Sequence, residues 1–338
     1  MDLFSTNVMT GVVNSLQTPP SFLVDRFFPA DQTEQSEEIH FDVENDVMGL
    51  APFVSPVVEG KVMSNVGFTT KTFKPAYVKP KNVWDNSRPL KRYKGEQIGG
   101  SLAPADRQRL ILADYLMQHI TLIRRRKEWM AAEVLRTGKV TISGELYQTV
   151  VVDFGRDAAL DETGNWANAT TALPLDDLQD WADLIAEKSG SEAHDVVMDI
   201  ATWKKFRNND QVKQRLKDQR PLTISPTIAQ EAAFQTGGNF MGAVDGFNIW
   251  VYSGRYKDDA GAIQKILPDG TVLLVGQLLG VKAYGAILDE AAGYQALPYF
   301  SKSWIENDPP RRFVMTQSAP LLVPYRPNAS LAAAITLS

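Results

Sequence analysis

The most regular hydrophobic pattern in the chain lies between Ser101 and Gly138. Pro104 suits the first turn of a helix and Gly138 suits its exit. The pattern predicts a helix over residues 104–137, and about 30 residues at ~1.5 Å each form a rod on the order of 45 Å long. A helix of this length suits a strut. Its apolar residues recur at spacings of three, four or seven, the stripe of one helical face, and are Leu112, Leu116, Ile120, Ile123, Met130 and Val134.

Alternating apolar and polar residues before this rod predict a long β-hairpin. Such period-two patterning is typical of strands, and the prolines that follow it keep the chain extended. A two-stranded hairpin is marginal alone in water. Because no adjacent strand completes a sheet, we expect the hairpin to lie on another surface, such as another subunit. The alternating segments are Ile39–Val43, Phe53-Val54, Val57–Val62 and Phe68–Phe73, with Gly60 and Gly67 between the limbs.

The N-terminal residues before this alternation keep neither a helical nor a strand period. Aromatic residues gather at Phe22-Leu23 and Phe27-Phe28-Pro29, and a polar acidic stretch follows them. This pattern predicts an extended arm that anchors through a few aromatic side chains onto something else. The alternative is a strand-and-loop prelude to a local core.

The rest of the chain alternates between strands and shorter helices. A helix is expected from Pro174 to Gly190, with Asp176 and Asp177 at the positive end of its dipole. The other predicted elements are strands within 139–154, a polar loop at 157–172, a strand at 195–198, helices at 200–207 and 210–217, a loop with a helical turn at 221–242, and strands at 247–253, 271–276 and 281–288. These form a compact α+β domain. Three strand-like pieces with nothing helical between them close the chain at 312–317, 319–323 and 330–337.

Composition limits the class of protein. The 338 residues are 44% hydrophobic and 22% charged, as in a globular chain of one or two interleaved domains. No apolar run is long enough to span a membrane and the first residues lack a signal-peptide pattern, so we expect the protein to stay in the cytoplasm. With no cysteine, disulfides and Cys-based zinc sites are excluded. His40, His119 and His194 lie too far apart in sequence to indicate a metal site.

Charge is unevenly distributed, although the net charge is only −5. Residues 88–139 hold 12 basic and 5 acidic side chains, whereas residues 153–199 hold 12 acidic and 2 basic ones. Blocks of opposite sign allow a chain to bind copies of itself head to side, and two solvated faces are the alternative. Arg124-Arg125-Arg126-Lys127 circles most of the rod, so at least one of them must approach the apolar face or a partner. A solvated face with intersubunit pairing is favoured here over nucleic-acid binding.

Motifs that would indicate an enzyme are incomplete. Asp153-Phe154-Gly155 resembles a kinase magnesium motif, but the other kinase motifs are absent. Residues 95–100 lack the Lys-Ser/Thr of a nucleotide loop and are expected to form a flexible joint. The acidic residues after Pro174 lack the oxygen-rich loop of a calcium site. Counting alone leaves a Ser-His-Asp set open, yet no Gly-x-Ser-x-Gly elbow is present. The sequence therefore predicts no enzyme, no metal and no cofactor.

Six further stretches are informative because of their order along the chain. They are FLVDRFFP at 22–29, VSPVVEG at 54–60, FKPAYVKPK at 73–81, Trp304, DPPRRF at 308–313 and QSAPL at 317–321. Together with the Arg-rich helix, they resemble the major capsid proteins of lambda-like tailed bacteriophages, the phage capsid E family. None is diagnostic alone, but the ordered set covers nearly the whole chain.

The resemblance implies an α+β chain with the Hong Kong 97 major capsid fold. Its expected parts are an N-terminal arm over 1–40, an extended hairpin (E-loop) over 41–85, a peripheral domain over 86–160 with the spine helix 104–137, an axial domain over 161–295, and return strands of the peripheral domain over 296–338. The residue patterns indicate an arm, a hairpin, a rod, a compact middle domain and returning strands without this resemblance.

The function that the resemblance implies is structural. Subunits of this fold form hexamers and pentamers that close an icosahedral shell around double-stranded DNA, and the hairpin of each lies across its neighbour. Expected partners are further copies of the chain, a portal protein at one vertex, an optional decoration protein at three-fold positions, and packaged DNA without sequence-specific binding. Because the arm begins almost at Met1, a separate scaffolding protein is also expected. The protein would belong to the virion after assembly in the host cytoplasm, without a membrane and without covalent Lys–Asn crosslinks.

Subunit contacts are expected from the arm, the hairpin, the rod and the last strands. The acidic arm and axial domain should pair with the basic groups around residues 88–92 and 124–127 of adjacent copies. The expected contact residues are Phe27, Phe28, Glu59, Lys61, Lys79, Lys81, Arg88, Lys91, Arg92, Arg124, Arg125, Arg126, Arg311 and Arg312.

Three other classes of protein compete with this interpretation. An encapsulin-like compartment would use the same fold, but its chain is usually shorter. A tail-tube subunit would be mostly β, which the long helix disfavours. An enzyme of unknown type would need a constellation of catalytic residues, which the sequence does not show.

Overall fold

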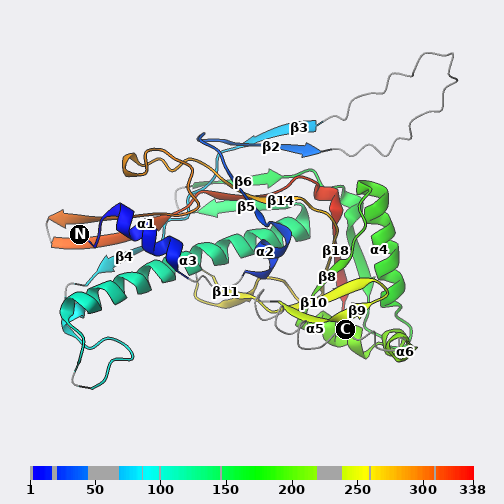
Figure 1. Cartoon of the computed structure of the whole chain (residues 1–338). Coiled ribbons are helices and arrows are strands. Elements are labelled where there is room, and N and C mark those ends of the chain that lie inside the picture. Colours follow the sequence, from blue (N-terminus) through cyan, green and yellow to red (C-terminus); the bar gives the residue numbers. More distant parts are fainter. Residues whose placement is uncertain are drawn as a thin grey trace, which may run out of the picture.

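The long helix α3 is the central element of the protein, described here by a computed structural model (Figure 1). Helices and strands are mixed along the chain, in agreement with the predicted α+β class. The loop expected at 221–242 lies outside the described residues up to residue 237. The structure describes residues 3–16, 21–44, 68–85, 87–98, 100–144, 147–218, 238–258, 260–307 and 310–338.

Six α-helices are present in the described residues. They are α1 (Thr6–Ser15), α2 (Phe22–Phe27), α3 (Pro104–Thr137), α4 (Pro174–Ser189), α5 (Ile200–Asn208) and α6 (Asp210–Asp218). Four 3₁₀ turns accompany them, at Arg88–Leu90 (η1), Ala158–Leu160 (η2), Glu290–Ala292 (η3) and Pro327–Ala329 (η4). The last of these separates two strands between which no helical residue was expected.

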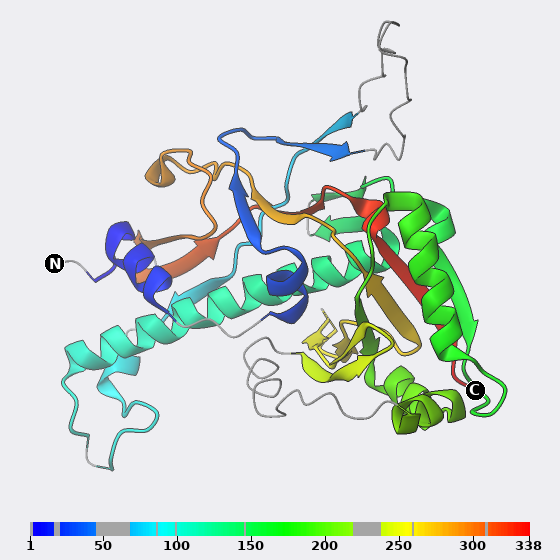
Figure 2. The ribbon, with the colours of Figure 1, turned by 45° about the vertical axis from the view of Figure 1, so that its right-hand side comes forward.

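The largest sheet has six strands and is covered on one face by α4 (Figure 2). Its order is β7 (Asp161–Asn165), β18 (Ser330–Thr336), β13 (Thr271–Val275), β8 (Asp195–Asp199), β10 (Phe247–Tyr252) and β9 (Asn239–Val244). Strands β7 and β18 are parallel, as are β8 and β10, and β13 is antiparallel to both β8 and β18. The carboxyl ends of β7, β18, β8 and β10 therefore meet at one edge of the sheet.

The remaining strands form two three-stranded sheets and three hairpins. One sheet has the order β1 (Ala30–Thr33), β14 (Gly280–Tyr284), β17 (Pro320–Pro324), and the other β15 (Phe300–Asn307), β16 (Pro310–Gln317), β4 (Lys81–Trp84). The hairpins are β2 (Ile39–Glu44) with β3 (Phe68–Phe73), β5 (Lys139–Gly144) with β6 (Tyr147–Asp153), and β11 (Arg255–Lys257) with β12 (Ile263–Lys265).

Helix α3 begins and ends where the sequence predicts. Pro104 occupies its first turn, and Gly138 ends it in the left-handed conformation (φ 65°), with its N–H donating to the Val134 carbonyl at 2.8 Å. A residue without a Cβ adopts this φ at little cost. Its 34 residues make a rod about 51 Å long. The predicted apolar stripe is buried along the whole helix, because Leu112, Leu116, Ile120, Ile123, Met130 and Val134 are each at most 4% exposed.

The prediction of an extended, non-periodic arm is wrong for two segments, which form α1 and α2. Helices of ten and six residues are too short to be stable alone in water. Their stability comes from packing: Met9 and Val13, one turn apart on α1, are buried beside the N-terminal half of α3. Such dependence on distant segments leaves little trace in the local pattern.

The predicted polar loop at 157–172 is wrong over Asp161–Asn165, which forms strand β7. Among the described strands it pairs only with β18, so it is an edge of the sheet. Its residues Asp-Glu-Thr-Gly-Asn have no apolar member, and the strand is therefore held by backbone pairing, which an apolar period does not report.

Strand pairing mixes the segments assigned to different domains. Strand β18, expected among the return strands of the peripheral domain, pairs with β13 and β7 of the six-stranded sheet. Strand β14, within the expected axial range, pairs with β17 and with the arm strand β1. The two lobes on either side of α3 are thus interleaved in sequence.

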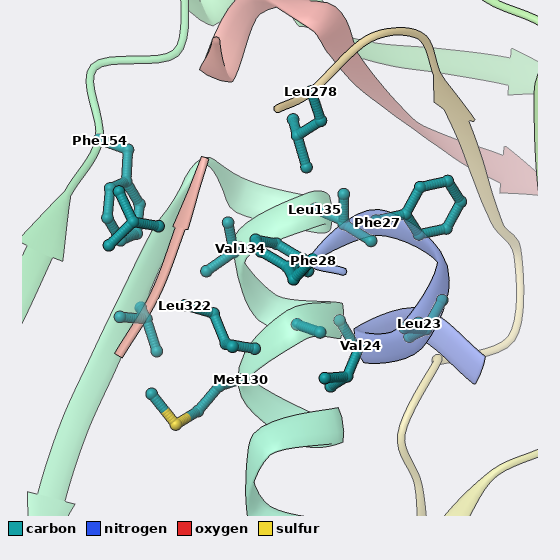
Figure 3. Packing of buried hydrophobic residues seen from close by; sticks show 14 of the residues in the cluster. Leu23, Val24, Phe27, Phe28, Met130, Val134, Leu135, Phe154, Leu278 and Leu322 are labelled. Atoms are coloured by element: carbon teal, nitrogen blue, oxygen red, sulfur yellow. The ribbon is translucent and has the colours of Figure 1, made fainter. Parts of the chain in front are cut away.

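Hydrophobic clusters surround α3 from end to end. Its C-terminal half, which includes Val134, contacts α2 and residues shown in Figure 3, among them Phe28 and Leu322. Its N-terminal half packs against α1 and the β15–β16–β4 sheet. A separate cluster fills the space between the six-stranded sheet and helices α4, α5 and α6. The rod is thus the strut that the sequence predicts, covered by segments from both ends of the chain.

Phe22 links the arm to the six-stranded sheet. Its ring is 1% exposed and lies 5.2 Å from the Trp250 ring and 5.9 Å from the Tyr252 ring. Because Phe22→Ala removes this buried ring, we expect the free energy of unfolding to fall by about 3–5 kcal/mol in urea titrations. Leu90→Ala, at a side chain that is 75% exposed, is the control and should change it by less than about 0.5 kcal/mol. Equal effects of the two substitutions would show that α2 is not docked as described.

Candidate subunit-contact surfaces

The hairpin formed by β2 and β3 is paired on one side only. Its antiparallel ladder runs from Ile39 opposite Phe73 to Glu44 opposite Phe68, and both strands form where the alternation predicts strands. No third strand joins it in the described residues. Each strand therefore presents an unpaired backbone edge, which is a ready surface for another chain. The second predicted limb at Val57–Val62, with Glu59 and Lys61, lies outside the described residues.

The base of this hairpin is fixed to the body of the protein. Ile39 and Phe41 are buried, and the Phe41 ring lies 5.4 Å from the Phe154 ring. The Lys71 ammonium donates to the backbone carbonyl of Asp153 at 2.6 Å, and the Tyr147 hydroxyl donates to the backbone carbonyl of Lys74, just after β3. The ladder thus leaves the core from a base formed by β6 and Phe154.

A buried carboxylate on α3 fixes the arm helix α2. Glu128 is 5% exposed and accepts from the backbone N–H groups of Leu23 (2.9 Å) and Val24 (3.1 Å) at the start of α2. Burial raises the pKa of Glu128, while these two donors oppose the rise. The arm residues Phe27 and Phe28, expected to contact other subunits, are buried in the chain's own core. That placement corresponds to the alternative of a local core.

The run of four basic residues in the middle of α3 divides among three environments. Arg124 pairs with Asp25 of the arm at 3.0 Å, so its expected acidic partner lies in the same chain. Arg125 and Arg126 are exposed, the latter over the Trp129 ring at 5.5 Å. Lys127 is buried. The prediction that one of the four must approach the apolar face is therefore confirmed.

Lys127 is an unusual core residue that the sequence analysis did not single out. Its side chain is 4% exposed, and its ammonium lies 3.1 Å from the hydroxyl groups of both Tyr284 and Tyr299. Burial, with the nearby charges of Arg124 and Lys282, lowers its pKa from 10.5 to about 7. The signal was present in the sequence, since Lys127 fills the gap of seven between Ile123 and Met130 in the apolar stripe.

This pKa makes stability depend on pH above neutrality. The pKa of Lys127 is about 7 in the folded chain and about 10.4 in the unfolded chain. At pH values between these two, the unfolded chain binds more protons at Lys127 than the folded chain does, so folding stability rises with pH. We expect Lys127→Met to remove up to about 1.4 kcal/mol per pH unit from the slope of unfolding free energy between pH 7 and 9.5. Urea titrations of both proteins across this range measure it. An unchanged slope would show that Lys127 stays charged in the fold.

The connection before α3 is organised around another carboxylate. Glu96 accepts from the Arg107 guanidinium (2.8 and 3.0 Å) and from the backbone N–H groups of Tyr93 and Leu102 (both 2.9 Å). The Arg107 bond, with these N–H donors, lowers the pKa of Glu96 to about 2. The flexible joint expected at 95–100 is therefore held by polar contacts, and it exposes Ile98 almost fully (97%).

The expected basic contacts lie in two groups at the end of the rod opposite the six-stranded sheet. Arg88, Lys91 and Arg92 are exposed on the connection held by Glu96. Four others lie on or beside the β15–β16–β4 sheet. Three of these stack on rings of their own chain: Lys79 on Tyr77, Lys81 on Phe313 and Arg312 on Phe4, while Arg311 is exposed. The predicted contact residues thus form separate patches along α3 and no single site.

The described part of the chain shows no grouping of three or more His, Asp or Glu side chains suited to a metal ion. In the same residues, no helix is long and apolar enough to cross a membrane. The described surface instead offers unpaired backbone edges, exposed cations and acidic helix faces, and these features are typical of protein–protein contacts.

Comparison with known proteins places the chain in a family. The family model "Phage major capsid protein E" matches residues 5–335. The chain is 30% identical over 315 residues to the major capsid protein of Escherichia phage lambda, covering 89% of this chain and 90% of that protein. It is 29% identical over 341 residues to the major capsid protein of Enterobacteria phage P21, with 96% of each covered.

A solved structure shows the same fold. The crystal structure of a prophage capsid protein from E. coli CFT073 superimposes with a TM-score of 0.74 at 24% identity, covering 98% of this chain and 99% of that one. The predicted Hong Kong 97-type α+β fold and the predicted lambda-like resemblance are confirmed. The chain belongs to the phage major capsid protein E family.

Proposed function

We propose that this chain is the shell-building subunit of a tailed-phage head, assembling into hexamers and pentamers that enclose double-stranded DNA. The observation that carries the proposal is the two-stranded hairpin of β2 and β3, which has an anchored base and, among the described residues, two unpaired edges. An isolated two-stranded ladder is marginal in water, and a neighbouring copy supplies the missing surface. Family membership and the phage capsid fold support the same role.

The mechanism is one of repeated weak binding. A closed shell makes each subunit interface many times over, so that no single contact needs to be strong. In this proposal residues 1–40 act as the arm, 41–85 as the E-loop, 86–160 and 296–338 as the peripheral domain, and 161–295 as the axial domain. The pairing of β18 with the six-stranded sheet connects the last range to the axial part as well.

The remaining partners follow from this role. A scaffolding protein would direct assembly, a portal would occupy one vertex, a decoration protein could bind at three-fold positions, and DNA would be held without sequence-specific contacts. The protein would end in the virion after assembly in the host cytoplasm and would have no enzymatic task. A net charge of −5 suits a wall that must not adhere to packaged DNA.

Expression of the chain, alone and with its neighbouring genes, tests the proposal directly. Negative-stain electron microscopy should then show hexameric rings or closed shells several hundred ångströms across. A monomer or dimer under every condition, with neither rings nor shells, would refute the capsid function.

A substitution at Arg125 tests assembly without disturbing the fold. It is exposed and makes no ion pair in the described residues, whereas Arg124 beside it is bonded to Asp25. We expect Arg125→Glu to reduce ring and shell formation in electron micrographs while changing the unfolding free energy by less than about 0.5 kcal/mol. The matched variant Arg124→Glu should instead lower stability, because it places two carboxylates together. If Arg125→Glu assembles normally but its monomer is less stable, then Arg125 stabilises the fold and is not a subunit contact.

A further inference from the structure

Two adjoining hollows lie where the six-stranded sheet meets α3. The larger, about 650 Å³, opens at the edge where the carboxyl ends of β7, β18, β8 and β10 meet, and its lining includes Ile200 and Lys204 of α5. The smaller, about 210 Å³, lies between α3 and the same lobe and includes Arg124 and Arg125. Both contain Tyr252, Gly254 and Arg255, so they are parts of one basic groove.

Positive charge dominates this groove. Its two carboxylates are Asp199 and Glu128, and both are occupied by backbone N–H donors: Asp199 accepts from Ala201, Thr202, Gly270 and Thr271, and Glu128 from Leu23 and Val24. The lining thus has a surplus of four positive charges (six minus two) in a chain whose net charge is −5. Its six cations are Arg124, Arg125, Lys204, Lys205, Arg255 and Lys265.

Three of the six cations form no direct contact with a carboxylate in the part of the chain that the structure describes, although the charge of Arg255 acts on Asp269 nearby. Lys204, Arg125 and Arg255 make neither an ion pair nor a side-chain hydrogen bond there. By contrast, Lys205 donates to a backbone carbonyl at 3.3 Å and Lys265 pairs with Asp269. Charges that are exposed, adjacent and of one sign repel each other, so a carboxylate-bearing partner at this groove would relieve the repulsion.

Helix α4 presents the opposite charge in matching form. Asp176, Asp180, Asp183 and Glu187 follow at spacings of four, three and four, so they form one stripe about 16 Å long on the exposed face of the helix. Asp180 and Asp183 make no ion pair or hydrogen bond to any described residue. Leu173, half exposed, directly precedes α4, three positions before Asp176. The stripe thus combines carboxylates with an exposed apolar side chain.

The arrangement of these surfaces suits a ring. Strand β2 runs toward the side of the molecule on which α4 lies, whereas α5 and β11, which border the groove, lie along its lower side in Figure 1. A neighbour that receives the hairpin would therefore also face α4. Two different surfaces of one chain that bind each other form a heterologous contact, the kind that closes five- and six-membered rings.

We infer that the acidic stripe of α4 in one copy docks on the basic groove of the next copy around each hexamer and pentamer. The inference rests on the proposed capsid function and names one of its interfaces. DNA is a poorer occupant, because phosphates would meet the cations at the rim but leave Ile200, which is 39% exposed, without an apolar partner. A helix that carries both carboxylates and Leu173 covers both parts of the groove.

Charge reversal on each side, alone and combined, tests this pairing. The variants are Lys204→Glu with Arg255→Glu in the groove, Asp180→Lys with Asp183→Lys on α4, and all four together. Each double reversal should weaken one interface by about tenfold or more, abolishing rings at protein concentrations where the wild type forms them. The fourfold variant should regain rings, since it restores opposite charges. Light scattering after gel filtration and negative-stain microscopy give the readout, and urea titration checks folding.

The control is Lys213→Glu, which reverses an exposed cation on α6 outside both surfaces and should assemble as the wild type does. Double variants that assemble normally would overturn the docking while leaving the capsid function intact. So would loss of assembly in folded double variants without recovery in the fourfold variant. If the groove variants assemble normally but are no longer retained on a DNA column, then the groove binds DNA phosphates and not α4. A wild-type chain that never forms rings would overturn both proposals.

Discussion

The fold depends on the coverage of one apolar stripe along a 34-residue helix. Segments that are near α3 in sequence are too few to shield an apolar stripe of this length from water. Both ends of the chain therefore pack against it. Helix α1 and strand β16 pack on its first half, and α2 with β5 and β17 on its second. This constraint explains why the lobes are interleaved and why the N-terminal arm contains helices that local pattern does not predict.

Two charged residues interrupt that stripe region, and each has a structural task. Glu128 accepts hydrogen bonds from N–H groups in the first turn of α2 that water would otherwise accept. This pairing fixes the point on α3 at which the arm docks. Lys127 is held between two tyrosine hydroxyls, and burial lowers its pKa to about 7. Buried charges of this kind add little net stability. They do specify which segment packs where, and in a subunit that must present fixed surfaces to many neighbours this positional role matters more.

Much of the fold could be predicted, because long elements leave periodic patterns. Pro104 and Gly138 predict the two ends of helix α3 to the residue, and alternation predicts the strands β2 and β3 but not their register. What failed was short or held by backbone alone: α1 and α2 form through packing, and β7 has no apolar residue. Among the expected contacts, Phe27 and Phe28 proved to be core residues, since burial inside a chain and burial between chains have the same sequence signature. The groove joins residues from six separate segments of the chain, which no linear pattern reveals.

The central claim is that the β2–β3 hairpin is completed by another copy of the chain. Hydrogen–deuterium exchange, compared between unassembled subunits and purified shells, tests it most directly. The outward-facing amides of β2 and β3 beyond His40 should exchange rapidly in the free subunit and become strongly protected in the shell, as buried or newly paired strand edges are. If these amides exchange equally fast in both states, the hairpin is not covered by a neighbour and the account of how this shell is held together is wrong.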